Sequence, residues 1–123
     1  MLYIENGVIA VTRGDDATLE VTVHTAAGED YPMSADDTLT LTVRALPSDS
    51  QPVLLSLTSA PGSSRLVLRG ADTADIAPGK YSCDIQLNRA GGGRYTVFPT
   101  PGPEALRFCN WENFVLLPEV TVP

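Results

Sequence analysis

Histidine and cysteine are scarce in this sequence. His24 is the only histidine, and Cys83 and Cys109 are the only cysteines. These side chains are too few to supply the four nitrogen or sulfur ligands of a structural zinc site. No nucleophile or carboxylate that the sequence makes evident accompanies His24, so we predict a surface histidine and no general base.

Motifs of catalysis and cofactor binding are also missing. The chain has no phosphate-binding glycine loop, no Gly-x-Ser-x-Gly element and no metalloprotease helix motif. A hydrolase built on a β-sandwich would need clustered carboxylates or a nucleophile with its base. We therefore expect no enzyme, no catalytic residue, no metal, no cofactor and no small-molecule substrate.

Basic residues are few. The chain has 8 Lys and Arg against 15 Asp and Glu, which gives a formal net charge of -7. An acidic surface repels nucleic-acid phosphates and anionic lipid headgroups. We expect neither a nucleic acid nor a membrane as partner.

Long hydrophobic runs are absent as well. The longest apolar pieces, such as 53–55 and 114–117, are far too short to span a bilayer. Residues 1–7 lack the basic, apolar and small-residue pattern of a signal peptide. This predicts synthesis in the cytoplasm without general secretion, which favours reduced, buried thiols at Cys83 and Cys109. By count alone, a disulfide between the two remains the alternative.

What the sequence does contain is period-two alternation, which is typical of half-buried β-strands. In 17–23, Ala17, Leu19, Val21 and Val23 alternate with polar residues. Similar runs predict further strands, and one short segment, Asp72–Ala77, predicts at most a single helical turn. Pro118 should disturb the last strand. The other predicted strands are 8–11, 38–46, 53–57, 65–69, 81–87, 94–98 and 113–122.

Short strands separated by Gly and Pro turns predict an all-β, antiparallel sandwich or barrel. The length of 123 residues suits one domain, 1–123. The alternating apolar positions predict the core: Leu19, Val21, Val23, Leu39, Leu41, Val43, Leu66, Leu68, Tyr81, Cys83, Ile85 and Leu87.

Arg13, Gly14 and Asp15 form the Arg-Gly-Asp tripeptide that many integrin ligands present on a loop. Here the tripeptide lies between two strand-like runs, where Gly14 supplies a positive φ and Asp15 can accept backbone hydrogen bonds. We interpret Arg13, Gly14 and Asp15 as a structural turn and not as an integrin site, because short motifs often match by chance.

Two other features allow two interpretations each. The acidic residues Asp15–Asp16, Asp36–Asp37 and Asp72 with Asp75 could gather calcium at one end of a sandwich, but solvated turn carboxylates are favoured. Trp111 is the only tryptophan. It could anchor an interface or close one end of the core, which we favour.

Several segments together resemble small immunoglobulin-like structural proteins of tailed phages and prophages. They are "IAVTRGD" (9–15), "GEDY" (28–31), "DTLTLTVR" (37–44), "GKYSCDIQL" (79–87) and "NFVLLPEVT" (113–121). The chain is similar to the N-terminal domain of phage baseplate upper proteins. The resemblance implies an immunoglobulin-like β-sandwich in a virion tail or baseplate. Those proteins continue into helical stalks, whereas this sequence stops at Pro123, so we expect a free-standing virion or tail-associated protein.

The expected function is therefore a non-enzymatic phage or prophage structural protein that acts by protein–protein contacts. Its partners would be other virion or tail proteins, or further copies of itself, after assembly inside the bacterial cytoplasm. Exposed strand edges are natural docking sites, and we predict them in Leu2–Thr12 and Asn113–Val122. The alternative is a carbohydrate- or host-surface-binding β-sandwich module, which would need an exposed aromatic platform.

Overall fold

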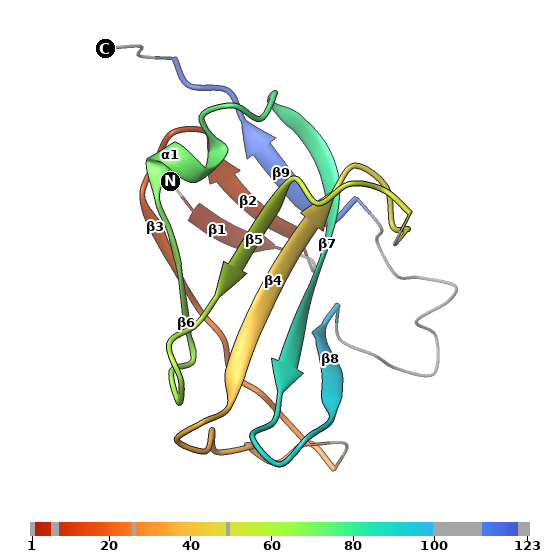
Figure 1. Cartoon of the computed structure of the whole chain (residues 1–123). Coiled ribbons are helices and arrows are strands. Elements are labelled where there is room, and N and C mark those ends of the chain that lie inside the picture. The colour runs from red at the N-terminus through yellow and green to blue at the C-terminus, as the bar shows by residue number, and fades with distance from the viewer. Residues whose placement is uncertain (1, 6–7, 26, 49, 100–111, 121–123) are drawn as a thin grey trace.

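The computed structural model describes residues 2–5, 8–25, 27–48, 50–99 and 112–120. In these residues the fold is predominantly β, as the sequence predicts, with a single short helix (Figure 1). The elements are β1 (Leu2–Glu5), β2 (Val8–Thr12), β3 (Ala17–Glu20), β4 (Thr38–Arg44), β5 (Leu55–Thr58), β6 (Arg65–Leu68), α1 (Gly70–Thr73), β7 (Gly79–Asn88), β8 (Arg94–Phe98) and β9 (Phe114–Leu117).

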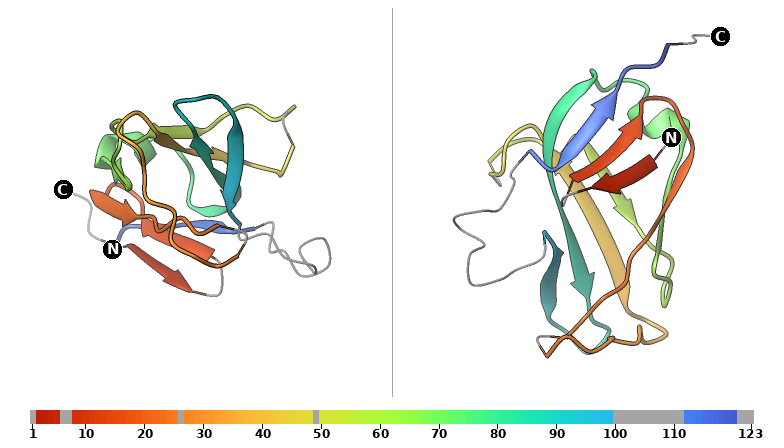
Figure 2. Two further views of the ribbon diagram at one scale, coloured as in Figure 1. Left: turned by 90° about the horizontal axis from the view of Figure 1, so that it is seen from below. Right: turned by 180° about the vertical axis from the view of Figure 1, so that it is seen from behind.

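The strands form one large and one small sheet. The large sheet has the order β1-β2-β9-β7-β4-β5, with β8 added to β7, and β3 pairs with β6 in the small sheet. Figure 2 shows β1, β2 and β9 in one layer, facing the layer that contains β4, β5 and β7. The strand β2 pairs with β9 in parallel, so the expectation of a purely antiparallel fold is wrong.

The prediction of exposed strand edges in Leu2–Thr12 and Asn113–Val122 also needs correction, because β2 and β9 pair with each other. Only β1 of the N-terminal segment lies at an edge, since β2 is paired on both sides. The strand β9 lies between β2 and β7, so the part of the predicted segment 113–122 that forms this strand, Phe114–Leu117, is not an edge. The run Ile9-Ala10-Val11 is buried without alternation, as is typical of an interior strand.

The long strand β7 organises the large sheet. Along one edge it pairs with β4 over residues 82–88, and on the other it pairs first with β9 and then with β8. At Cys83, between the part of β7 that pairs with β9 and the part that pairs with β8, no strand pairs with this edge of β7. The buried side-chain amide of Asn113 makes the hydrogen bonds that a neighbouring strand would make there. Its Oδ1 accepts a hydrogen bond from the Cys83 N–H at 2.7 Å, and its Nδ2 donates to the Cys83 carbonyl at 2.9 Å.

The core follows the predicted alternation closely. Of the residues predicted to form it, all are buried except Val21 and Tyr81, which are partly buried against it. The alternation in β4 is complete, with Leu39, Leu41 and Val43 all inside. The structure adds residues from strands whose role the sequence left open: Ile9, Val11, Leu55, Phe114 and Leu116.

Some boundaries differ from those predicted. The helix α1 begins at Gly70 instead of Asp72, because the Asp72 carboxylate accepts a hydrogen bond from the Arg69 N–H at 2.8 Å and closes the first turn. The strand β3 ends at Glu20 although burial still alternates as far as Val23. The last strand ends at Leu117, directly before Pro118.

Candidate functional site

The Arg-Gly-Asp tripeptide lies in a tight turn that rests on α1. Gly14 has φ 83°, and the Asp15 N–H donates to the Thr12 carbonyl at 3.1 Å. The Gly14 N–H donates to Thr73 Oγ1 at 2.9 Å. The Arg13 side chain donates from Nε to the Ala74 carbonyl at 3.1 Å. These contacts place the three residues in a turn whose guanidinium is held by Ala74, directly after α1; that the tripeptide is not an integrin site stays a prediction.

A close backbone approach fixes this turn to α1. The Gly70 N–H donates to Asp16 Oδ1 at 2.7 Å. A Cβ atom at Gly70 would lie 2.3 Å from the Gly14 carbonyl oxygen, a distance that no real side chain tolerates. Glycine is therefore required at position 70 for steric reasons that the sequence pattern alone does not reveal.

The acidic pairs do not gather at one end. Asp16 and Asp72 lie around α1, whereas Asp36 and Asp37 precede β4 at the opposite end of the molecule (Figure 1). Both Asp16 and Asp72 accept hydrogen bonds from backbone amides. Within the described residues, no group of three or more His, Cys, Asp or Glu side chains could hold a metal ion. The single calcium end that the acidic residues suggested is not formed.

The Asp37 side chain is buried and hydrogen-bonded to several loops, so the prediction of a solvated turn carboxylate is wrong at this position. Its carboxylate accepts hydrogen bonds from the Tyr31 hydroxyl at 2.8 Å and from the N–H groups of Ser34 and Ala90, each at 3.0 Å. Its carbonyl accepts from the Gly62 N–H at 2.8 Å. These bonds, first the one from Ala90, then Ser34 and Tyr31, lower the pKa of Asp37. Asp37 thereby joins the loop before β4, the β5–β6 loop and the β7–β8 hairpin.

The β7–β8 hairpin that Asp37 holds carries an exposed aromatic ring and two cations. The Arg89 guanidinium lies 5.7 Å from the centre of the Tyr31 ring, within the range of a cation–π contact. Tyr95 is 53% exposed, and Arg94 is exposed as well. No Asp or Glu occurs in 85–103, so the tip of this hairpin and the strand β8 lack acidic side chains.

A second exposed feature is the loop that joins β4 to β5. It presents three large apolar side chains: Leu46 at 57%, Val53 at 49% and Leu54 at 37% exposure. The Arg44 guanidinium donates to the carbonyls of Ser48 at 3.3 Å and Gln51 at 3.2 Å. Arg44 thus ties the described residues Ser48 and Gln51 to the end of β4, while the three apolar side chains stay exposed.

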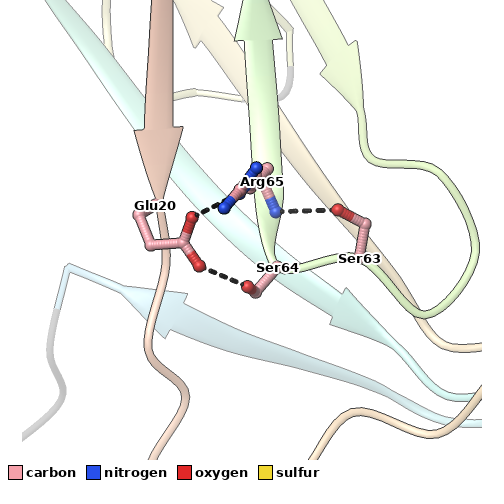
Figure 3. Close-up of polar contacts among 4 residues, drawn as sticks. All are labelled: Glu20, Ser63, Ser64 and Arg65. Carbon is pink, nitrogen blue, oxygen red and sulfur yellow. Dashed lines mark hydrogen bonds and ion pairs between the residues drawn. The ribbon is translucent and has the colours of Figure 1, made fainter.

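By contrast, one end of the β3–β6 sheet is closed by polar contacts (Figure 3). The Glu20 carboxylate accepts hydrogen bonds from Ser64 Oγ at 2.6 Å and from Arg65 Nε at 3.0 Å. The Ser63 hydroxyl accepts from the Arg65 N–H at 3.1 Å. The Ser64 hydroxyl and then Arg65 lower the pKa of Glu20. The charged and polar side chains at this end are therefore hydrogen-bonded to one another.

The remaining candidate residues have separate environments. His24 is exposed, as predicted, but it has a carboxylate partner, since its Nδ1 lies 3.2 Å from Asp30 Oδ1. Cys83 is a buried free thiol whose pKa is raised to about 12, mainly by burial and also by the charge of Asp84. Cys109 and Trp111 lie outside the described residues. The possible roles of Trp111 therefore stay predictions.

Comparisons with protein-family models, with curated proteins and with solved structures found no match. Among the described residues, no helix has the length and apolar character needed to cross a membrane.

Proposed function

We propose that the fold is an immunoglobulin-like β-sandwich. Two features support this proposal. First, the strand order places β4 beside β7 in one layer, pairs β3 with β6 separately and brings β2 alongside β9 in parallel. Second, Tyr81 lies near the start of β7, two residues before Cys83, and its hydroxyl donates to the Ala77 carbonyl. That contact has the form of the tyrosine corner of immunoglobulin-like domains.

We further propose that this protein is a non-enzymatic structural component of a phage or prophage tail or baseplate that works by protein–protein contact. The observation that carries the contact role is the exposure of Leu46, Val53 and Leu54 on one loop, which joins β4 to β5. Large apolar side chains exposed on one segment mark interaction sites, and the hydrogen bonds from Arg44 to Ser48 and Gln51 limit the entropy that this segment loses on binding. The sequence resemblance supplies the phage setting.

The loop can be tested with a matched pair of variants. Leu46→Asp with Leu54→Asp places charges on the loop, and Val67→Asp does the same at a similarly exposed apolar residue, 47% exposed, on β6. Tagged protein would be produced in a culture releasing the particles, and the particles would be separated on a density gradient. We expect wild type and Val67→Asp in the particle fraction and the loop variant outside it. Wild type found only as free protein, or a loop variant incorporated like wild type, would refute the proposal.

One observation favours the alternative of a carbohydrate- or host-surface-binding module. Tyr95 is exposed on the hairpin that also carries Arg89 stacked on Tyr31, and sugars stack on such rings. A glycan array probed with wild type and Tyr95→Ala decides this alternative. Binding that the variant loses would support it, and an array without hits would remove it.

A further inference from the structure

The carboxylate of Asp84 lies on the outer face of the large sheet, at the end where the β4–β5 loop begins. Asp84 of β7 pairs with Thr42 of β4, and Arg44 at the end of β4 pairs with Ser82. Because side chains alternate between the two faces of a sheet, Thr42, Arg44 and Asp84 all point away from the core. Figure 1 shows the β4–β5 loop passing the upper part of β7.

The Asp84 side chain is half-buried, yet it lacks a hydrogen-bond donor. Within the described part of the chain, no hydrogen bond or ion pair reaches its carboxylate. Burial raises the pKa of Asp84, and the charge of Arg44 opposes this effect. The Arg44 guanidinium, however, donates to the carbonyls of Ser48 and Gln51. A carboxylate that has lost part of its hydration without gaining a donor favours a partner that supplies one.

The exposed apolar side chains of the loop lie at the same end of β4. Leu46 is 57% exposed, Val53 49% and Leu54 37%. The Leu54 N–H donates to the Val43 carbonyl at 2.8 Å, which holds Leu54 at the end of β4. Lysine and arginine side chains pack their aliphatic stems on apolar surface and extend the charged head to a carboxylate. Apolar side chains near a carboxylate without a donor suit such a residue.

We propose that Asp84 and the exposed side chains of Leu46, Val53 and Leu54 bind a segment of another protein that carries Lys or Arg among apolar residues. This inference rests on the proposed function and names the chemistry of the partner that the β4–β5 loop contacts. The cation donates to Asp84, while its stem and its apolar neighbours pack on the loop. The net charge of -7 attracts a basic segment to this surface and repels an acidic one.

The test is a selection from a yeast-displayed library of random peptides with the full chain as bait. Dissociation constants of the enriched peptides are then measured by fluorescence anisotropy. The variants are Asp84→Asn, which keeps the shape and removes the charge, and the double variant Leu46→Ser with Leu54→Ser. Asp75→Asn is the matched control, because it removes one charge from an exposed residue beyond α1. Thermal unfolding checks that each variant is folded.

We expect the enriched peptides to carry Lys or Arg next to apolar residues. Asp84→Asn and the double variant should each raise the dissociation constant at least about 10-fold, the loss of a charge-assisted hydrogen bond or of apolar contact. Asp75→Asn should leave it unchanged. A library without binders or enriched peptides without a basic residue would overturn the proposal. So would equal losses for Asp84→Asn and Asp75→Asn, or binding that the double variant retains.

Failure of this proposal is distinguishable from failure of the proposed function. The particle experiment asks whether the loop holds the protein in a particle, whatever the chemistry of the partner. If wild type enters particles and the loop variant does not, while peptide binding ignores Asp84→Asn, only the basic partner is wrong. If basic peptides bind through Asp84 but wild type stays out of particles, the binding site stands and the phage setting is wrong.

Discussion

At the scale of single residues, Asn113 is the side chain on which the large sheet depends most directly. Its amide satisfies both backbone groups of Cys83 at the point where neither β9 nor β8 reaches β7. We expect Asn113→Leu to lower the free energy of unfolding by about 2–4 kcal/mol, because a buried N–H and a buried C=O lose their partners. Urea unfolding followed by circular dichroism measures this.

Asn88→Ala is the matched control for Asn113. Asn88 is half-buried and, among the described residues, donates to the hydroxyls of Thr38 and Thr40 on the outer side of the sheet. Water can replace those hydrogen bonds, so this variant should lose no more than about 1 kcal/mol. Equal losses for both variants would contradict the strand-replacing role of Asn113.

A second residue-scale prediction concerns Gly70. An added methyl group would collide with the Gly14 backbone, which cannot rotate away as a side chain can. We expect Gly70→Ala to destabilise the protein by about 1–3 kcal/mol, the usual range for overpacking. Gly91→Ala is the control, since a Cβ there meets nothing within 4 Å. Similar melting temperatures for the two variants would show that the turn and α1 separate easily.

At the scale of elements, Asp37 couples three loops, and its pKa gives this coupling a pH dependence. A carboxyl group whose pKa is lowered in the folded state stabilises the fold above its ordinary value of 3.8. That stability is lost as the pH falls through the lowered folded value. We expect Asp37→Asn to melt at a lower temperature than wild type at pH 7, with a difference that shrinks below about pH 4.

The exposed neighbour Asp36 supplies the control for this measurement. Asp36→Asn removes the same charge one residue away from the junction. Its melting temperature should follow that of wild type through the acid range. A difference for Asp37→Asn that stays constant with pH would mean that the loops are joined without the ionised carboxylate.

The elements also show how far sequence reasoning reaches. Alternation predicted β4, β6 and nearly the whole core, because one dry face per strand leaves a period-two pattern, whereas β8 was predicted from the glycine-rich hairpin tip 90–93. It could not give the direction of the β2–β9 pair or the interior place of β9, since both depend on contacts far apart in sequence. Asp37 and Asn113 were missed for a related reason. Polar residues beside strands normally face water, and only the assembled sheet reveals the backbone groups that they satisfy.

At the scale of the whole molecule, a carboxylate whose burial is not fully offset disfavours the folded state of this acidic chain. Asp84 on β7 is the clearest case, because burial raises its pKa and the charge of Arg44 offsets this effect only in part. A raised carboxyl pKa means that the fold disfavours the ionised form. Stability therefore falls as the pH rises from the ordinary value of 3.8 through the raised one, and the penalty is fully present above the raised value.

We therefore expect Asp84→Asn to raise the melting temperature at pH 7 and to have little effect well below the ordinary pKa of 3.8, where Asp84 is protonated in both states. Asp75→Asn is the control that separates the effect of burial at Asp84 from the effect of a smaller net negative charge. Both variants change the net charge from -7 to -6, but Asp75 is exposed beyond α1. If burial is the cause, Asp84→Asn stabilises more than Asp75→Asn and salt does not remove the difference. Equal gains that vanish in salt would mean that self-repulsion of the whole acidic surface is responsible.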